Sequence, residues 1–264
     1  MPSPGETKRL IDREAKNLIP IANYQKRIVL HENFQLGRPV LAATLDPSTI
    51  NQAAVRLLTG ANKRWIISGT NAANAGSALN IDGGIALATA GADNDQIILS
   101  PATAINSVAQ SLFRVVEWEP EHAVEFEAHI DLPSIANVLV QVGLGLTANL
   151  DLTTDNDKAA IQFSTEGLTS TTKFTGNTSI GAVDQDGIAS TKAPIADKTI
   201  RLKVRTDSAR MARFYVNDVE FGSSPALTAG VNFIPYIGIQ ALAAAAKTIK
   251  VREIFISRYK IADV

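Results

Sequence analysis

Strict alternation of apolar and polar residues over HAVEFEAHIDL, residues 122–132, is the feature that most constrains how this chain folds. Apolar residues occupy one parity and charged residues the other: Val124, Phe126, Ala128, Ile130 and Leu132 against Glu125, Glu127, His129 and Asp131. Because successive side chains of a β-strand point to opposite faces, this pattern predicts a half-buried strand.

The same period of two recurs along most of the chain after Arg27. Further strands are predicted at 27–34, 64–69, 111–119, 138–146, 158–165, 199–207, 211–216, 233–241 and 248–259. Segments 83–91 and 95–100 are predicted to form a hairpin around Asp93-Asn94, and Asn217-Asp218 is predicted to form a tight turn. The apolar parity shifts between Val251 and Ile254, which predicts a β-bulge near Arg252-Glu253.

About a dozen strands with short polar turns and little helix predict an all-β fold of two packed antiparallel sheets. We expect one sandwich domain over residues 28–264, with Phe214, Val216 and Phe221 in its core.

Residues 1–27 differ from the rest, because ETKRLIDREAKNLI has apolar residues at helical spacing and is followed by Pro20. The predicted amphipathic helix either packs on its own domain or forms an arm that docks on a neighbouring subunit. In the second case its contact residues are Arg9, Leu10, Ile11, Lys16, Leu18 and Ile19.

Composition excludes several classes of protein. The chain has no cysteine, only three scattered histidines and a formal net charge of -1. These features argue against disulfides and thiolate or histidine metal sites, and against a general attraction to nucleic acid. No run of about eighteen apolar residues and no secretory signal are present, so we expect no membrane partner and synthesis in a cytoplasm.

The C-terminal third has a recognisable order of strands, in the run IRLKVRTDSARMARFYVNDVEFGSSPALTAGVNFIPYIGIQALAAAAKTIKVREIFISR. Together with EFEAHIDLPSIANVLVQVGLG, it resembles concanavalin A-like (LamG-like) sandwich domains, and in particular those of tailed-bacteriophage virion proteins. The resemblance covers residues 110–260 and implies an antiparallel jelly-roll sandwich located in a virion. Because such folds carry lectins, glycosidases and structural modules, function has to be argued from a site.

Two outward carboxylates, Glu125 and Glu127, have the spacing that glycoside hydrolysis needs. Glycosidases of the resembled fold carry a Glu-x-Asp-x-x-Glu run, whereas EFEAHID has Glu127 in place of the Asp and His129 or Ile130 in place of the last Glu. A solvated strand face is therefore favoured over catalysis.

Other candidate sites are weaker. Asp-rich loops at 91–96, 151–158 and 183–187 offer oxygen ligands for calcium, but Asp and Asn are also ordinary turn residues, so we expect no metal and no cofactor. Trp65 and Trp118 are the candidate aromatic platforms for a glycan. The basic stripe Arg201, Lys203 and Arg205 is expected to be a solvated face, without the aromatic residues that bind single-stranded nucleic acid.

The sequence thus favours a non-enzymatic virion protein, a capsid decoration or cement subunit that binds the major capsid protein or other virion subunits. A homo-oligomer is expected, with a trimer favoured. The alternative is a tail or fibre component that binds host glycans through Trp65 or Trp118, and a glycosidase using Glu125 and Glu127 is less favoured.

Overall fold

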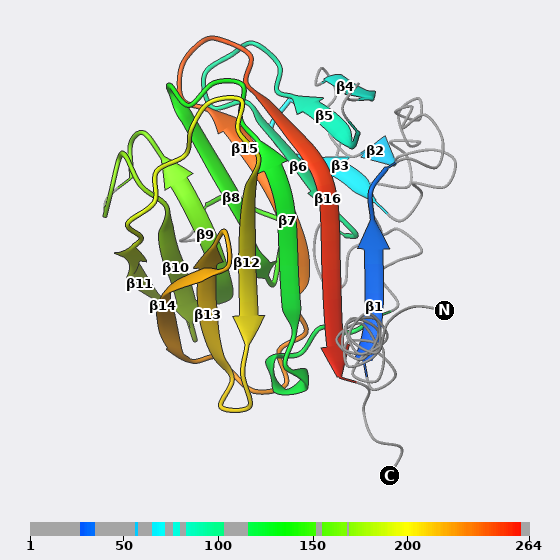
Figure 1. Ribbon diagram of the computed structural model, residues 1–264, viewed down its shortest axis with the longest axis vertical. Helices are drawn as coiled ribbons and strands as arrows, with labels where there is room; N and C mark the ends of the chain where they lie inside the picture. Colours follow the sequence, from blue (N-terminus) through cyan, green and yellow to red (C-terminus); the bar gives the residue numbers. More distant parts are fainter. Residues whose placement is uncertain are drawn as a thin grey trace, which may run out of the picture.

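The computed structural model describes residues 27–34, 56–57, 65–71, 76–79, 83–102, 116–151, 155–167 and 169–259. In this part of the chain the fold is almost entirely antiparallel β-structure, arranged as two sheets packed face to face (Figure 1). The prediction of an all-β sandwich is confirmed. The predicted helix of residues 1–27, with Arg9, Leu10, Ile11, Lys16, Leu18 and Ile19, lies outside the described residues.

The front sheet of Figure 1 has the strand order β14-β13-β12-β7-β16-β5-β4, and β1 also pairs with β16. Its strands are β1 (Arg27–Glu32), β4 (Gly76–Leu79), β5 (Ile85–Ala88), β7 (Glu125–Asp131), β12 (Ile200–Thr206), β13 (Met211–Val216), β14 (Val219–Ala226) and β16 (Thr248–Tyr259).

The back sheet has the order β11-β10-β9-β8-β15-β6-β3-β2. Its strands are β2 (Arg56–Leu57), β3 (Ile66–Ser68), β6 (Gln96–Ser100), β8 (Val138–Gly145), β9 (Asp157–Ser164), β10 (Thr175–Ile180), β11 (Val183–Ala189) and β15 (Ile234–Ala241). A short 3-10 helix, η4 (Pro120–His122), precedes β7. Among the described residues, no helix is long and apolar enough to cross a membrane.

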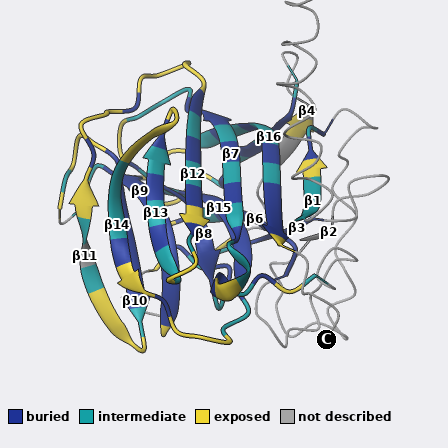
Figure 2. Ribbon diagram, turned by 60° about the horizontal axis from the view of Figure 1, so that its bottom comes forward, coloured by how far each residue is buried: buried dark blue, intermediate teal, exposed yellow. Residues whose placement is uncertain are grey.

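The main core lies between the two sheets and follows the alternation of the sequence. On β7 the side chains of Phe126, Ala128 and Ile130 are fully buried, and the residues between them are only partly covered (Figure 2). Phe214 and Val216 are also buried, and Phe221 packs partly buried against them. Burial of such side chains is the main favourable term in folding.

The hairpin predicted around Asp93-Asn94 is wrong, because β5 belongs to the front sheet and β6 to the back sheet. Backbone hydrogen bonds from Thr89 to Lys247 and from Asn94 to Ala241 show that the β5–β6 connection follows the β15–β16 connection. Each short strand therefore pairs with a long C-terminal strand of its own sheet. Local alternation does not report which sheet a strand joins.

A second, smaller core covers part of the outer face of the back sheet. Ile98, Leu150, Ala160, Ile234 and Tyr236 belong to this buried cluster. The described residues of the β8–β9 connection lie over the sheet here, so that outward residues of β8 and β9 are buried as well.

Candidate functional site

The candidate site lies on the outer face of the front sheet, where β7, β12, β16 and β1 run side by side. On β7, the alternation that buries Phe126 and Ala128 places Glu125, Glu127 and His129 on the opposite face. Their side chains keep 23%, 13% and 27% of their surface exposed, so they are held by neighbours and still reachable from solvent.

The strand register determines which residues join these three. On β12, Lys203 lies opposite Glu127. On β16, Phe255 lies opposite Glu127 and Glu253 opposite His129. His31 of β1 lies opposite Phe255. Because directly opposed residues of neighbouring strands project to the same face, the register brings distant parts of the chain into one cluster.

A β-bulge in β16 is what places Glu253 in this cluster. The pairing of β16 with β7 shifts between Val251 and Glu253, which confirms the bulge predicted from the sequence. Both bulge residues therefore lie on the outer face: Arg252 donates to Asp131 at 2.7 Å, and Glu253 turns toward the histidines. Without the extra residue, alternation would direct Glu253 into the core.

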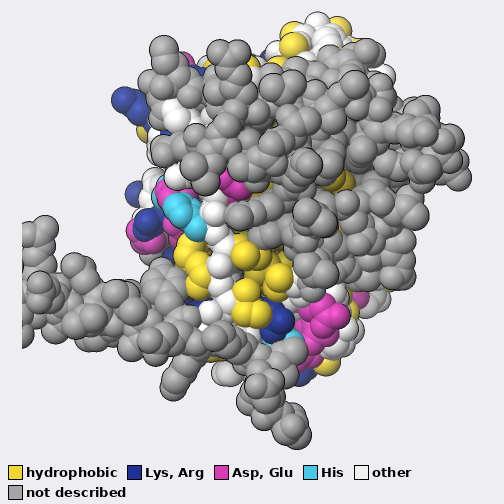
Figure 3. Space-filling view, turned by 90° about the vertical axis from the view of Figure 1, so that its right-hand side faces the viewer, with side chains coloured by type: hydrophobic (Ala, Val, Ile, Leu, Met, Phe, Trp, Pro, Cys, Tyr) yellow, Lys and Arg dark blue, Asp and Glu magenta, His cyan; other side chains and the backbone are white. Residues whose placement is uncertain are grey.

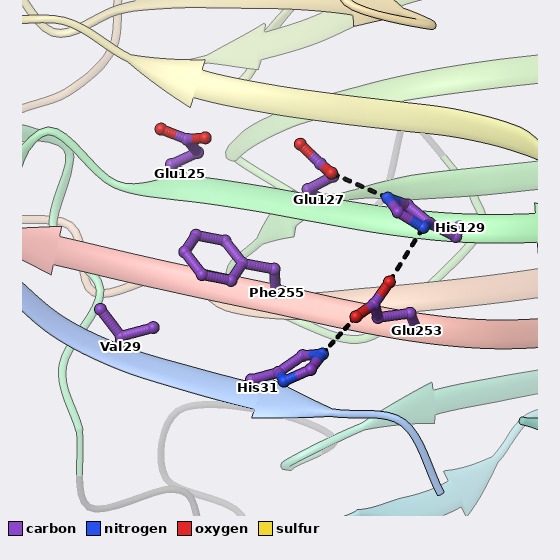
Figure 4. Close-up of a pocket in the computed structure, with 7 residues that line it drawn as sticks. All are labelled: Val29, His31, Glu125, Glu127, His129, Glu253 and Phe255. Atoms are coloured by element: carbon purple, nitrogen blue, oxygen red, sulfur yellow. Dashed lines mark hydrogen bonds and ion pairs between the residues drawn. The ribbon is translucent and has the colours of Figure 1, made fainter. Parts of the chain in front are cut away.

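The imidazoles and carboxylates form a continuous chain of polar contacts (Figure 4). His129 Nε2 lies 2.8 Å from Glu127 Oε1, and His129 Nδ1 lies 3.1 Å from Glu253 Oε2. The other carboxylate oxygen of Glu253 contacts His31 Nε2. These contacts hold each side chain in one orientation before any ligand arrives.

Basic residues of β12 complete the network. Lys203 Nζ lies 3.7 Å from Glu125 Oε1 and 3.5 Å from Glu127 Oε2, and Arg201 Nε lies 3.6 Å from Glu127 Oε1. Burial acts to raise the pKa of Glu127, but the hydrogen bond with His129 and the charges of Lys203 and Arg201 outweigh it, so the pKa is lowered. Glu127 is therefore an ionised acceptor at neutral pH.

The cluster lines an open hollow of about 490 Å³, which we call the acidic hollow. It is defined by Val29, His31, Glu125, Glu127, His129, Glu253 and Phe255. Figure 3 looks at the side of the molecule that carries β1, where hydrophobic side chains lie between groups of histidine and acidic side chains. Carboxylates that accept hydrogen bonds, imidazoles and the half-buried ring of Phe255 together suit a hydroxyl-rich ligand.

Sequence reasoning identified only part of this site. The alternation of β7 predicts Glu125, Glu127 and His129 on one outward face, but it does not connect Glu253 and His31 with that face. The one available signal was the parity shift in β16, which predicted the bulge and thereby an outward Glu253. Nothing in the sequence indicates that β1 pairs with β16 and brings His31 to within reach.

The two tryptophans proposed as glycan platforms do not form a surface in this structure. Trp65 and Trp118 are each only 1% exposed and belong to the main core. Trp65 packs beside Phe34, at 6.4 Å between ring centroids. A strand is predicted at 111–119, but its described part, residues 116–119, does not form one. The backbone N–H of Trp118 donates a hydrogen bond to Asn232 Oδ1 at 2.9 Å. The prediction fails because large rings fill the sandwich interior.

In the Asp-rich segment 151–158, the positive charge beside Asp155 comes from the side chain of Lys158. Lys158 is fully buried, and its ammonium donates to the backbone oxygens of Asn149 and Asp151 at 2.8 and 2.7 Å. The Asp155 carboxylate lies 3.6 Å away and the Tyr236 ring centroid 5.5 Å away. Within the described residues, no group of three or more His, Asp or Glu side chains is placed to hold a metal ion.

Comparison with known proteins gives structural neighbours only. No protein-family profile and no curated protein sequence matches the chain. A glycoside hydrolase family 16 enzyme of Bacteroides ovatus, solved with a G4G4G3G product, matches with a TM-score of 0.53 and 11% identity over 86% of this chain and 99% of its own. The carbohydrate recognition domain of Emp47p matches with a TM-score of 0.52 and 9% identity over 82% of this chain and 100% of its own.

A protein of unknown function from Shewanella oneidensis matches over 100% of this chain and 98% of its own, with a TM-score of 0.51 and 14% identity. At these identities the likeness shows the fold alone. The fold is a concanavalin A-like jelly-roll sandwich.

The expectation of a non-enzymatic protein is corrected by these neighbours. Solved structures of this fold include family 16 glucanases from Bacteroides ovatus and a β-glucanase from Bacillus licheniformis. The Glu-x-Asp-x-x-Glu run is incomplete in this chain, and the motif does not show which residues the neighbouring strands bring to the same face.

Proposed function

We propose that the protein binds carbohydrate in the acidic hollow. The observation that carries this proposal is the pre-oriented chain of Glu127, His129, Glu253 and His31 on an accessible sheet face. Charge-assisted hydrogen bonds to fixed carboxylates are the strong kind, and sugar hydroxyls are their natural donors. The presence of a carbohydrate recognition domain among the structural neighbours agrees with this proposal.

Each part of the hollow has a definite role in such binding. Glu127 is held ionised and accepts hydrogen bonds from ligand hydroxyls. Glu125, whose contact is with Lys203 at 3.7 Å, is the second acceptor. Phe255 and Val29 lie on the floor between the strands, where they can contact the C–H face of a sugar ring (Figure 4).

Replacing Glu127 with glutamine is expected to weaken glycan binding by about ten- to a hundredfold, because a hydrogen bond to a charged group contributes roughly 1.5 to 3 kcal/mol. The measurement is affinity electrophoresis and isothermal titration calorimetry with laminarin and mixed-linkage β-glucan. Glu117→Gln is the matched control, because Glu117 is exposed and lies outside the hollow. Equal affinity of the Glu127 variant and the control variant would refute the assignment.

A second candidate function is glycosidic bond hydrolysis in the same hollow. Glu125 and Glu127 share one face of β7, and residues two apart on a strand are separated by about 7 Å. That spacing falls in the range of about 6.5 to 9.5 Å at which one carboxyl protonates the leaving oxygen and the other activates a water. The lowered pKa of Glu127 suits the role of base, and Glu125 is the second carboxyl of the pair.

If the hollow hydrolyses glucan, Glu125→Gln and Glu127→Gln are each expected to lower reducing-end release by at least about a hundredfold. The substrate is mixed-linkage β-glucan, and the wild-type rate and the Glu117→Gln rate are the references. Residual release that is the same in all four proteins would point to a contaminating enzyme and contradict this second assignment.

The virion assignment stays a prediction. It depends on the resemblance of residues 110–260 to phage sandwich domains, and so do the capsid partner, the trimer and the location in a virion. A glycan-binding hollow is compatible with the tail or fibre alternative, in which the protein contacts a host surface.

A further inference from the structure

We propose that the protein has a second carbohydrate-binding site, a groove on the outer face of the back sheet that accepts a neutral oligosaccharide. The groove has a volume of about 290 Å³ and is lined by residues that include Asn94, Leu139, Gln162, Glu166, Gln240 and Leu242. We call it the amide groove. Its strands are β8, β9, β10 and β15, so the two sheets of the sandwich separate it from the acidic hollow.

The amide of Gln162 is oriented by a buried relay. The Tyr236 hydroxyl donates to Gln141 Oε1 at 2.8 Å, so that the NH₂ group of Gln141 donates to Leu150 O and to Gln162 Oε1 at 2.8 and 2.6 Å. Burial raises the pKa of Tyr236, which keeps the hydroxyl protonated as the first donor. Because the oxygen of Gln162 is used inward, its NH₂ group is the end that remains for the groove.

A second relay orients Asn94 at the other end of the groove. Gln96 Nε2 donates to Gln240 Oε1 at 3.2 Å, and Gln240 Nε2 donates to Asn94 Oδ1 at 2.8 Å. The NH₂ group of Asn94 is therefore directed away from Gln240. Asn94 has a φ of 64°, a conformation that asparagine tolerates better than most residues, and this places its amide at the turn before β6.

The chemistry of the groove selects its ligand class. Its polar groups are amides and the hydroxyls of Ser164, Thr169 and Thr175, with Glu166 as the one acidic residue among those that line it. Two leucine side chains, Leu139 and Leu242, supply apolar surface for C–H groups. Fixed amide donors, one carboxylate and apolar contacts match the ring hydroxyls and C–H faces of an uncharged sugar, whereas Glu166 repels phosphate or sulfate.

Fixing an amide before binding lowers the entropic cost of association. Two separate hydrogen-bond relays each end at the groove with an amide donor. The formation of a turn or of the sheet does not require either relay. The site does not depend on the function of the acidic hollow, because no residue lines both.

The test uses the full chain carrying Glu127→Gln, so that binding in the acidic hollow does not mask the result. The probes are laminarihexaose, cellohexaose, maltohexaose, xylohexaose and mannohexaose, each added to ¹⁵N-labelled protein. We expect at least one hexasaccharide to shift the side-chain NH₂ signals of Gln162 and Asn94, which are assigned by their loss in Gln162→Leu and Asn94→Asp. Each of these two substitutions should weaken that binding at least tenfold.

Asn156→Asp is the matched control for Asn94→Asp, because Asn156 is exposed and does not line the groove. If Gln162→Leu does not fold, the result for Asn94→Asp decides the test. We expect Asn94→Asp to fold, because the side chain of Asn94 is exposed and aspartate tolerates the same φ. The proposal is overturned if no hexasaccharide shifts these signals at millimolar concentration, or if the shift of the Gln162 signal persists unchanged in Asn94→Asp.

Discussion

Replacing Lys158 with methionine is expected to lower the free energy of unfolding by about 3 to 5 kcal/mol, which is the usual cost of removing one partner of a buried ion pair. The ammonium of Lys158 is fully enclosed and is bound by the backbone oxygens of Asn149 and Asp151. Burial lowers the pKa of Lys158, and the Asp155 charge opposes that shift. Methionine fills the space, but it leaves the Asp155 carboxylate without its cation and two carbonyl oxygens without their donor.

The measurement is chemical denaturation at neutral pH, with Lys173→Met as the matched control, because Lys173 is exposed. Asp155→Asn in the Lys158→Met background should recover part of the loss, since it removes the uncompensated charge. Asp155 also accepts hydrogen bonds from Thr147, so recovery will be incomplete. A loss below about 1 kcal/mol, within the range of a surface ion pair, would show that the lysine does not hold the β8–β9 connection in place.

Replacing Gly84 with alanine is expected to destabilise the sandwich by about 2 to 5 kcal/mol and to disrupt the acidic hollow. Gly84 has a φ of 85°, and a Cβ added there would lie 2.2 Å from Val251 O and 2.5 Å from Arg252 Cα. The left-handed conformation costs roughly 1–2 kcal/mol for an L-residue, and overpacking costs about 1–3 kcal/mol more. The clash falls on the bulge that turns Glu253 outward, so glycan affinity should fall as well.

Two control variants separate these effects. Gly91→Ala should be neutral, because a Cβ at Gly91 meets nothing within 4 Å. Gly230→Ala should show only the conformational cost, because Gly230 has a φ of 68° and open space around it. Measurements of thermal unfolding and of glycan binding on all three variants decide the question. Gly84→Ala with the stability and affinity of Gly91→Ala would mean that the bulge does not depend on this close approach.

The residues of one strand could be assigned to a face from the sequence, because the period of side-chain direction is a property of the backbone itself. The alternation places Glu125, Glu127 and His129 on one face in this way. The bulge in β16 was visible as a parity shift. The turn at Asn217-Asp218 was visible because both residue types tolerate positive φ, and their φ values are 50° and 65°.

Strand pairing between distant segments could not be read from the same pattern. Alternation says that a strand has an apolar face, but not which partner or which sheet covers it. The separation of β5 and β6 into different sheets and the pairing of β1 with β16 depend on the arrangement of the whole sandwich. The burial of Trp65 and Trp118 depends on it too, because a large ring suits either a surface platform or an interior.

By itself the sequence determined the fold class, the outward face of β7 and the irregularity of the last strand, since each of these follows from local backbone geometry and side-chain type. Only the tertiary structure decided that Glu253 and His31 join Glu127, that Lys158 supplies the charge inside an acidic loop, and that two amide relays end in one groove. The physical reason is that these contacts join residues on different strands or loops, and their register is set by the packing of two sheets.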